Sequence, residues 1–305
     1  MMESLQSLAG PAGWAGPAGF VMLALVTFLA AAINSVAGGG TILTFPVLAA
    51  ILPADPTRLV TANATSTIGL WPGAVAAAWA YRGDRAGLLS STDSTRSTGS
   101  SRSTGSSHWT RWLLLPSVAG AIVGALLVIV LPPQWFDVLV PWLILTAALL
   151  FALQPQLTKV RGVFPATAVP HDAHPAADAC PAPANVPLAC LLQFLVAVYG
   201  GYFGAGIGIL MLAMLGMLGL GDIHRLNAVK NVLGMLVNGA AAGLFVVGSL
   251  VGGQDVSWPH AAVMAAAAIA GGLAGSALAR RLPARIVRRG VAIIAFALAG
   301  YYFVA

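Results

Sequence analysis

The sequence predicts an all-α, polytopic helical membrane protein built from two inverted repeats with broken or re-entrant half-helices and about 8–10 membrane segments. Composition is the first observation, because 58% of the residues are hydrophobic and only 8% are charged, whereas charged residues make up about a quarter of a soluble domain. The second is a series of apolar runs, which must form helices or a closed barrel because lipid offers the backbone no hydrogen-bond partners. Their long, continuous apolar character, instead of ten-residue alternation, selects helices. The third is a glycine-rich pattern that occurs once in each half.

Ten apolar segments are long enough to enter a bilayer, and we expect them at 20–36, 41–52, 57–79, 112–131, 135–153, 187–204, 206–220, 226–250, 258–279 and 286–304. The segments 41–52 and 206–220 are short of the roughly 20 residues that cross a bilayer, so each either crosses or re-enters. The first repeat covers 1–153, a Pro/Ala-rich linker covers 154–186, and the second repeat covers 187–305. The Ser/Thr-rich loop 82–110 contains RSTGSS twice and is expected to be disordered.

The basic residues indicate which side of the membrane each loop faces. Thirteen of the 15 lysines and arginines fall in four loops. These loops all lie on one side of the membrane if each short segment, taken together with the segment before it, crosses the membrane an even number of times. Only Arg58 falls on the other side, and Lys230 lies within a span. The positive-inside tendency then makes the basic side cytoplasmic and places both termini outside.

The halves correspond at an offset of about 166 residues when NSVAGGGTILTFPVLAAILPADPTRLVTANAT is set beside GGYFGAGIGILMLAMLGMLGLGDIHRLNAVKN. Each half has a glycine cluster, a short apolar run, an Asp-x-x-Arg turn and a long span. The charge map places Asp55 and Arg58 outside but their counterparts Asp222 and Arg225 inside. The repeats are therefore predicted to be inverted, a pattern typical of secondary transporters with a central binding site.

The glycines let one helix end and another begin at close quarters, which leaves N–H groups at the second helix start without internal partners. Such a start carries a partial positive charge and binds anions. Polar residues in the following span of each half add donors. The expected substrate-binding residues are Asn34, Gly38, Gly39, Gly40, Thr41, Asn63, Thr65, Ser66, Gly204, Gly206, Gly208, Lys230, Asn231 and Asn238.

Two simpler interpretations stay open at this point. Small residues also let membrane helices pack closely without any ligand. Lys230 is an ionisable side chain within a span, which usually marks a functional site. It lies about five residues into its span, however, and could instead extend to water at the cytoplasmic side.

The motifs NSVAGGGTILTFPVL and YGGYFGAGIGILMLAML, each followed by a loop and an Ala-rich polar span, resemble those of the sulfite exporter TauE/SafE family, also called toluene-sulfonate uptake permeases. The resemblance covers nearly the whole chain except the loops 82–110 and 155–186. It implies transport of sulfite, organosulfonates or related small anions across the bacterial inner membrane. The proline that follows the glycine motif is present as Pro46 but is replaced near Leu212 and Ala213, which leaves the shape of the second half-helix open.

We therefore expect a secondary transporter, a permease or exporter of small anions such as sulfite or organosulfonates, that works by alternating access. A passive anion channel is the first alternative; a membrane-embedded enzyme or an accessory subunit has less support. Neither a catalytic residue nor a cofactor is expected, because acidic and histidine residues fall in loops or at span edges. The cluster His171, Asp172, His174 and Cys180 fits a solvated linker better than a metal site. The expected partners are a small anion and the lipid bilayer, not nucleic acid, and the oligomeric state is left open.

Overall fold

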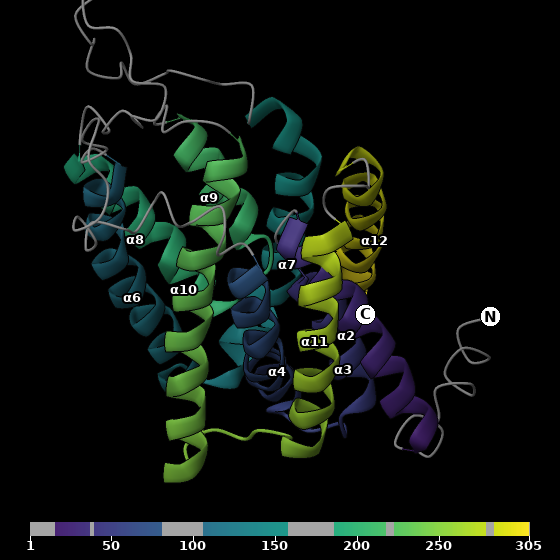
Figure 1. The fold of residues 1–305 in the computed structure, drawn as a ribbon. Coiled ribbons are helices and arrows are strands. Elements are labelled where there is room, and N and C mark those ends of the chain that lie inside the picture. Colours follow the sequence, from purple (N-terminus) through teal and green to yellow (C-terminus); the bar gives the residue numbers. More distant parts are fainter. Residues whose placement is uncertain are drawn as a thin grey trace, which may run out of the picture.

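The computed structural model describes residues 16–36, 40–80, 106–157, 186–217, 223–278 and 284–304. This part of the chain is all-helical (Figure 1). The helices of the first half are α2 (Pro17–Val36), α3 (Thr41–Ile51), α4 (Arg58–Ala80), α6 (Ser106–Val130) and α7 (Pro133–Leu157). Those of the second half are α8 (Val186–Tyr202), α9 (Ile207–Met217), α10 (Ile223–Val251), α11 (Trp258–Leu278) and α12 (Ala284–Val304).

Each of the ten predicted apolar segments corresponds to one of these helices, which confirms the all-α fold class. The boundaries differ most at α6, which begins at Ser106 inside the loop predicted as disordered, and at α7, which continues to Leu157 beyond residue 153. Apolar composition marks the stretch that enters lipid, but backbone hydrogen bonding carries a helix past it into the polar interface. Residues 81–105 and 158–185, which include most of the predicted loop and linker, lie outside the described residues.

Within the described ranges, five helices are long and apolar enough to cross a membrane: Pro17–Ser35, Arg111–Val130, Pro133–Leu150, Leu226–Val251 and Trp258–Gly275. The two short helices α3 and α9 have 11 residues each. Eleven residues span about 16 Å, roughly half of the hydrocarbon core. Neither helix is therefore long enough to cross by itself.

The helix α3 runs back along α2. Its N-terminal Gly40 packs against Ala30 and Asn34, near the end of α2. At the other end of α3, Val47 and Ala50 line the same cavity as Met22, which is near the start of α2. The chain therefore turns back after α2, so that α2 and α3 form a helical hairpin; its re-entry into the membrane stays a prediction.

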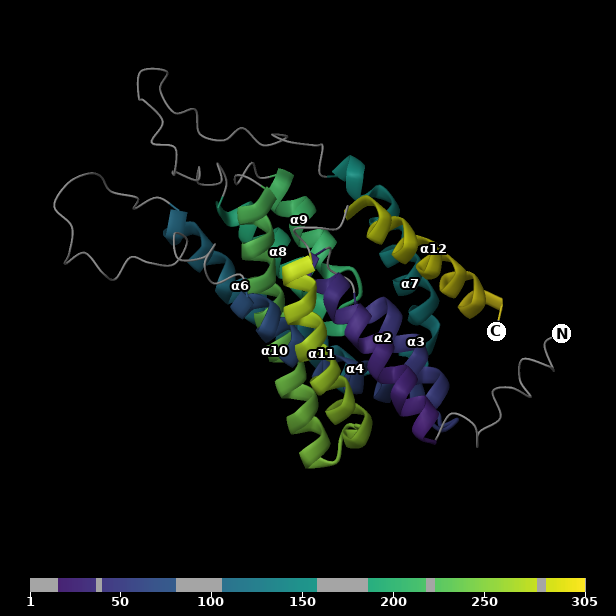
Figure 2. The same ribbon diagram turned by 45° about the vertical axis from the view of Figure 1, so that its right-hand side comes forward.

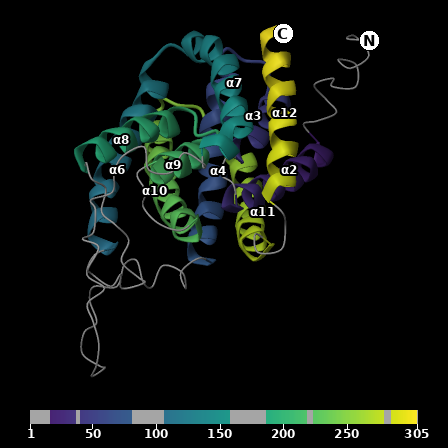
Figure 3. The ribbon, with the colours of Figure 1, turned by 90° about the horizontal axis from the view of Figure 1, so that it is seen from above.

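Most helices of the first half pack against helices of the second half. The helix α6 packs mainly on α8, α11 packs on α2 and α4, and α10 packs between α4 and α6. The helices α7 and α12 lie side by side (Figure 2 and Figure 3). If α2, α3, α4, α6 and α7 are matched with α8, α9, α10, α11 and α12, the pair α6–α8 corresponds to α11–α2. This correspondence supports the predicted repeat, which stays a prediction.

Glycines allow the helices of the pair α6–α8, and likewise those of the pair α11–α2, to pack closely. A Cβ atom added at Gly124 of α6 would collide with the carbonyl oxygen of Val198 in α8. One added at Gly275 of α11 would collide with atoms of Ala32 and Ser35 in α2. Each glycine has another four residues before it, Gly120 and Gly271, which is the small-x-x-x-small pattern of tightly packed membrane helices.

The turn before α4 lies at the C-terminal end of α10. In this turn the backbone N–H and the hydroxyl of Thr57 both donate to Asp55 Oδ1, at 2.9 and 3.0 Å. Because these bonds favour the carboxylate, they hold the pKa of Asp55 below its ordinary value. The Thr57 hydroxyl also lies 3.5 Å from Asp255 Oδ2, in the turn that follows α10.

The two Asp-x-x-Arg turns therefore lie far apart. The helix α10 has 29 residues and is about 43 Å long. Asp55 and Thr57 are beside its C-terminal end, whereas Arg225 is in its first turn. This separation supports the inverted orientation of the repeats, which stays a prediction.

Candidate functional site

The first helix break lies between α2 and α3. The helix α3 begins after Gly40, which has helical dihedral angles (φ −55°, ψ −30°) and gives no side-chain cap. Leu43 N–H and Thr44 N–H donate to the Gly40 carbonyl, at 3.0 and 3.4 Å. The earlier N–H groups of the helix start have no acceptor within the helix, as expected for an uncapped N-terminus. Gly38 and Gly39 lie outside the described residues.

The second break, between α8 and α9, depends on two glycines with positive φ. Gly204 has φ +77° and Gly206 has φ +75°, values that other L-residues adopt only at a cost. The Tyr199 hydroxyl donates to the Ala205 carbonyl at 2.6 Å and thereby holds the irregular segment. Although α9 lacks a proline corresponding to Pro46, both short helices have the same length.

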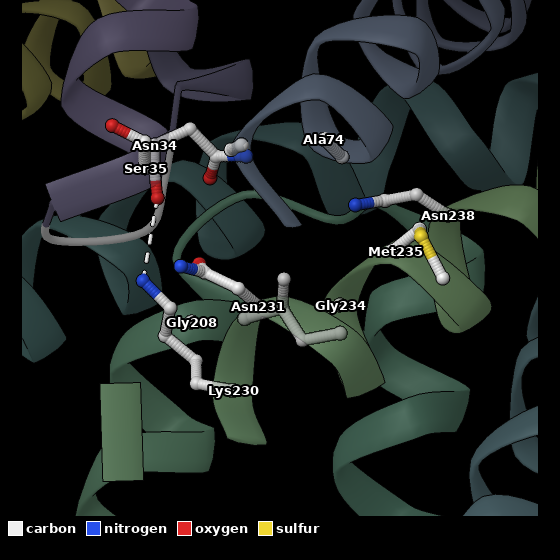
Figure 4. A pocket seen from close by; sticks show the side chains of 11 residues that line it. Asn34, Ser35, Ala74, Gly208, Lys230, Asn231, Gly234, Met235 and Asn238 are labelled. Carbon is white, nitrogen blue, oxygen red and sulfur yellow. Dashed lines mark hydrogen bonds between the residues drawn. The ribbon is translucent and has the colours of Figure 1, made fainter. Parts of the chain in front are cut away.

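A small cavity of about 20 Å³ lies between the two breaks (Figure 4). It has little more room than one water molecule needs. Four helices form its wall: Asn34 and Ser35 from α2, Ala74 and Ala77 from α4, Ile207 and Gly208 from α9, and Lys230, Asn231, Gly234, Met235 and Asn238 from α10. The site therefore combines residues of both halves.

Lys230 brings a cationic group to this cavity. Its side chain is 3% exposed, and its Nζ donates to the backbone carbonyl of Asn34 at 3.3 Å. The side chain is thus directed at the end of α2 instead of extending along α10 to water, which argues against the snorkelling interpretation. No carboxylate lies among the described residues that line the cavity, so no acidic side chain there balances this charge.

Two further groups at the cavity offer unpaired donors. Asn231 is 8% exposed, and its Nδ2 is buried without a hydrogen-bond partner. Gly208 is buried in the first turn of α9, where the backbone N–H groups are not all satisfied within the helix. A buried unpaired donor is costly. A negatively charged solute is the kind of partner that would satisfy both groups together with Lys230.

The start of α3, at the first break, lies close to the second break. A Cβ atom added at Gly204 would lie 3.8 Å from both Thr41 Oγ1 and Asn238 Oδ1. The start of α3, the break after α8 and the middle of α10 therefore meet. Figure 4 shows Asn34, Asn231 and Asn238 around one space, with Lys230 at its edge and the Asn34 hydrogen bond dashed.

Three predicted residues of α4 do not line this cavity. The Asn63 side-chain amide donates to the Tyr202 carbonyl at 3.0 Å, at the end of α8. Thr65 accepts a hydrogen bond from Ser257 N–H at 3.0 Å, and Ser66 pairs with Thr44 at 2.8 Å.

These bonds connect α4 to neighbouring helices. Asn63 contacts the end of α8, before the second break, just as Lys230 contacts the end of α2, before the first break. Of the remaining glycines, Gly40 faces α2, and Gly206 faces Ala147 of α7.

Some residues at the site were not predicted. Ser35 follows Asn34 directly and could have been found as a second polar residue of the same motif. Tyr199 precedes the second glycine cluster, where a hydroxyl group in an apolar segment needs a partner. Met235 lines the cavity, and its carbonyl accepts from Trp71 Nε1 at 3.2 Å. No sequence signal distinguishes it from the other apolar residues of α10.

Comparison with known proteins agrees with this architecture. The family model described as sulfite exporter TauE/SafE matches residues 23–302. The probable membrane transporter protein ORF9 of Sinorhizobium sp. is 28% identical over 277 residues, which cover 91% of this chain and 89% of that protein. No solved structure matches the chain. With a match that extends over nearly all of its length, the chain belongs to the sulfite exporter TauE/SafE family of membrane transporters.

Proposed function

We propose that this transporter is a permease or exporter of small anions, with sulfite or organosulfonates as substrates, and that the anion binds between the two helix breaks. The observation that carries the proposal is the buried Lys230 side chain, which has no carboxylate partner among the lining residues described. An ionisable group at such a position costs on the order of 3 kcal/mol. A bound anion would offset that cost.

The donors at the cavity also favour an anion over a cation. An ammonium group offers three N–H donors and no acceptor, and the only hydrogen bond described for Lys230 is the one to the Asn34 carbonyl. The unpaired Asn231 Nδ2 adds another donor. Charge-assisted hydrogen bonds to an oxyanion are stronger than neutral ones, so a sulfite or sulfonate group suits this set.

The small volume of the cavity favours a mechanism with moving parts. An anion larger than water cannot occupy about 20 Å³ without rearrangement. We infer alternating access, in which the two inverted halves move relative to each other around the site. Contacts between the halves, such as Ser257 with Thr65 and Asp255 with Thr57, would close the side at the C-terminal end of α10.

The proposed location is the bacterial inner membrane, with both termini outside. An inside-negative potential would drive an anion outward by roughly 2.3 kcal/mol per charge per 100 mV. Export therefore needs no coupled ion in principle.

Transport into proteoliposomes tests this function. The wild-type protein should give saturable flux of sulfite or a sulfonate in a panel that also contains sulfate and carboxylates. Lys230→Ala should lower that flux at least about tenfold, because it removes the cation. Thr146→Val, which changes an exposed residue of α7 away from the cavity, should leave the flux unchanged.

Three results would contradict the proposal. Equal flux of every anion in Lys230→Ala and wild type would remove Lys230 from the site. Flux that never saturates would indicate a passive channel. Chemical conversion of the anion, without transport, would indicate a membrane-embedded enzyme.

A further inference from the structure

A second and larger cavity, of about 700 Å³, lies between the α2–α3 hairpin and the α7–α12 pair. Much of its wall is apolar, with Met22 from α2, Pro46 and Val47 from α3, Leu59 from α4 and Leu298 from α12. The volume is within the roughly 300–1,000 Å³ of ligand sites. None of the residues around Lys230 lines it, so it is separate from the proposed anion site.

Two opposite charges line this cavity. Arg58 is the first residue of α4 and Asp137 is the fifth residue of α7. Arg58 acts electrostatically on Asp137, and no ion pair between the two is described in this part of the chain. The cavity therefore presents a cation and an anion next to an apolar wall.

Aromatic residues indicate the depth of these charges in the bilayer. Trp135 is 60% exposed and lies two residues before Asp137. Trp258 is 47% exposed and begins α11, just after the turn in which Asp255 contacts Thr57. Tryptophan is enriched at the membrane–water interface. An interface at Trp135 and Trp258 would place Arg58 and Asp137 at the level of the lipid headgroups.

We propose that this cavity binds one phosphatidylethanolamine molecule. Its phosphate pairs with Arg58, its primary ammonium pairs with Asp137, and the upper part of an acyl chain lies along the apolar wall between α3 and α12. Phosphatidylglycerol would leave Asp137 without a cationic partner, and the quaternary ammonium of phosphatidylcholine has no N–H to donate to the carboxylate. The lipid would then link the α2–α3 hairpin to the last helix.

Native mass spectrometry of the purified full chain, mixed with equal amounts of phosphatidylethanolamine, phosphatidylglycerol and phosphatidylcholine, tests this proposal. Phosphatidylethanolamine should be retained at least about fivefold over the other two lipids, and Arg58→Gln or Asp137→Asn should each remove most of that preference. Arg111→Gln and Asp255→Asn are matched controls, because neither residue lines the cavity. Both controls should keep the preference.

Ala50→Trp provides a test that changes neither charge. Ala50 lines the cavity, and a tryptophan there should fill it and reduce phosphatidylethanolamine retention in a protein that still elutes as a single species. Equal retention of all three lipids by the wild type would overturn the proposal, and so would retention unaffected by all three variants. Displacement of the lipid by toluenesulfonate would also overturn it, because the cavity would then be a solute site.

Discussion

In the proposed function, selectivity for an anion depends on a few atoms of neighbouring residues on α10. Lys230 supplies a charge with one carbonyl contact, and Asn231 supplies an amide nitrogen without a partner. Because both are buried, their interaction with a bound anion is weakened little by solvent. The same burial makes the site sensitive to any added negative charge.

Asn231→Asp should weaken anion binding strongly with little change in side-chain shape. The new carboxylate would pair with Lys230 and repel the substrate. At an effective dielectric constant of about 20, two charges 4 Å apart interact by about 4 kcal/mol, so we expect KM for sulfite to rise at least about tenfold.

Gln254→Glu is the matched control, because it adds the same charge in the turn at the other end of α10. Its KM should stay near the wild-type value. An unchanged KM in Asn231→Asp would show that the anion binds elsewhere.

The residues that carry the proposed chemistry were only partly predictable from the sequence. A lysine within a span and polar residues beside duplicated glycines predicted Lys230, Asn231, Asn238 and Asn34, which do line one cavity. Asn63 and Ser66 show the same signal but bind neighbouring helices. A polar side chain within a span needs a hydrogen-bond partner. Whether that partner is another part of the protein or a solute depends on how α4 is rotated about its own axis, which the sequence does not reveal.

Among the elements, the two helix breaks fix the geometry of the site. Each break ends one helix and starts an 11-residue helix near the cavity. The second break needs positive φ at Gly204 and Gly206. At the first break, Gly40 is needed because a Cβ atom there would collide with the carbonyl oxygen of Ala30.

Gly204→Ala should lower the free energy of unfolding by about 1–2 kcal/mol, since a Cβ atom makes this conformation unfavourable. The added atom would also lie 3.3 Å from the Gly200 carbonyl oxygen. Thermal unfolding in detergent measures the effect.

Gly216→Ala makes the same change in α9, where no atom lies within 4 Å and φ is not positive. It should be neutral or stabilising by up to about 1 kcal/mol. Equal melting temperatures for Gly204→Ala and wild type would contradict the conformation assigned to the second break.

The helices themselves were predictable because lipid permits only helices and closed barrels, and long continuous apolar runs select helices. Their ends were less so. Residues 106–111 contain no long apolar run, yet α6 begins at Ser106. The return of α3 along α2 was left open as either crossing or re-entry, because it depends on the contact of Gly40 with Ala30, ten residues earlier in the chain.

In the whole molecule, each half completes the packing of the other. Lys230 of the second half contacts the end of α2, and Asn63 of the first half contacts the end of α8. The sequence predicted that the halves correspond, but it did not predict that α6 packs on α8 and α11 on α2. Such pairing depends on glycine contacts between distant segments, as at Gly124 and Val198.

The proposed opposite orientation of the halves predicts opposite labelling of their Asp-x-x-Arg turns. In a background with both cysteines replaced by serine, Pro56→Cys should react with an impermeant maleimide from outside intact cells. Arg225→Cys should react only after the membrane is opened. Labelling of both positions from the same side would rule out inversion.

The central claim, that both halves form one anion site around Lys230, is tested most directly by equilibrium binding. Titration of the purified protein with sulfite, or with the best transported sulfonate, should give one anion per chain, and Lys230→Met should abolish that binding while leaving the melting temperature of the free protein nearly unchanged. Two anions per chain, or undiminished binding by Lys230→Met, would contradict it.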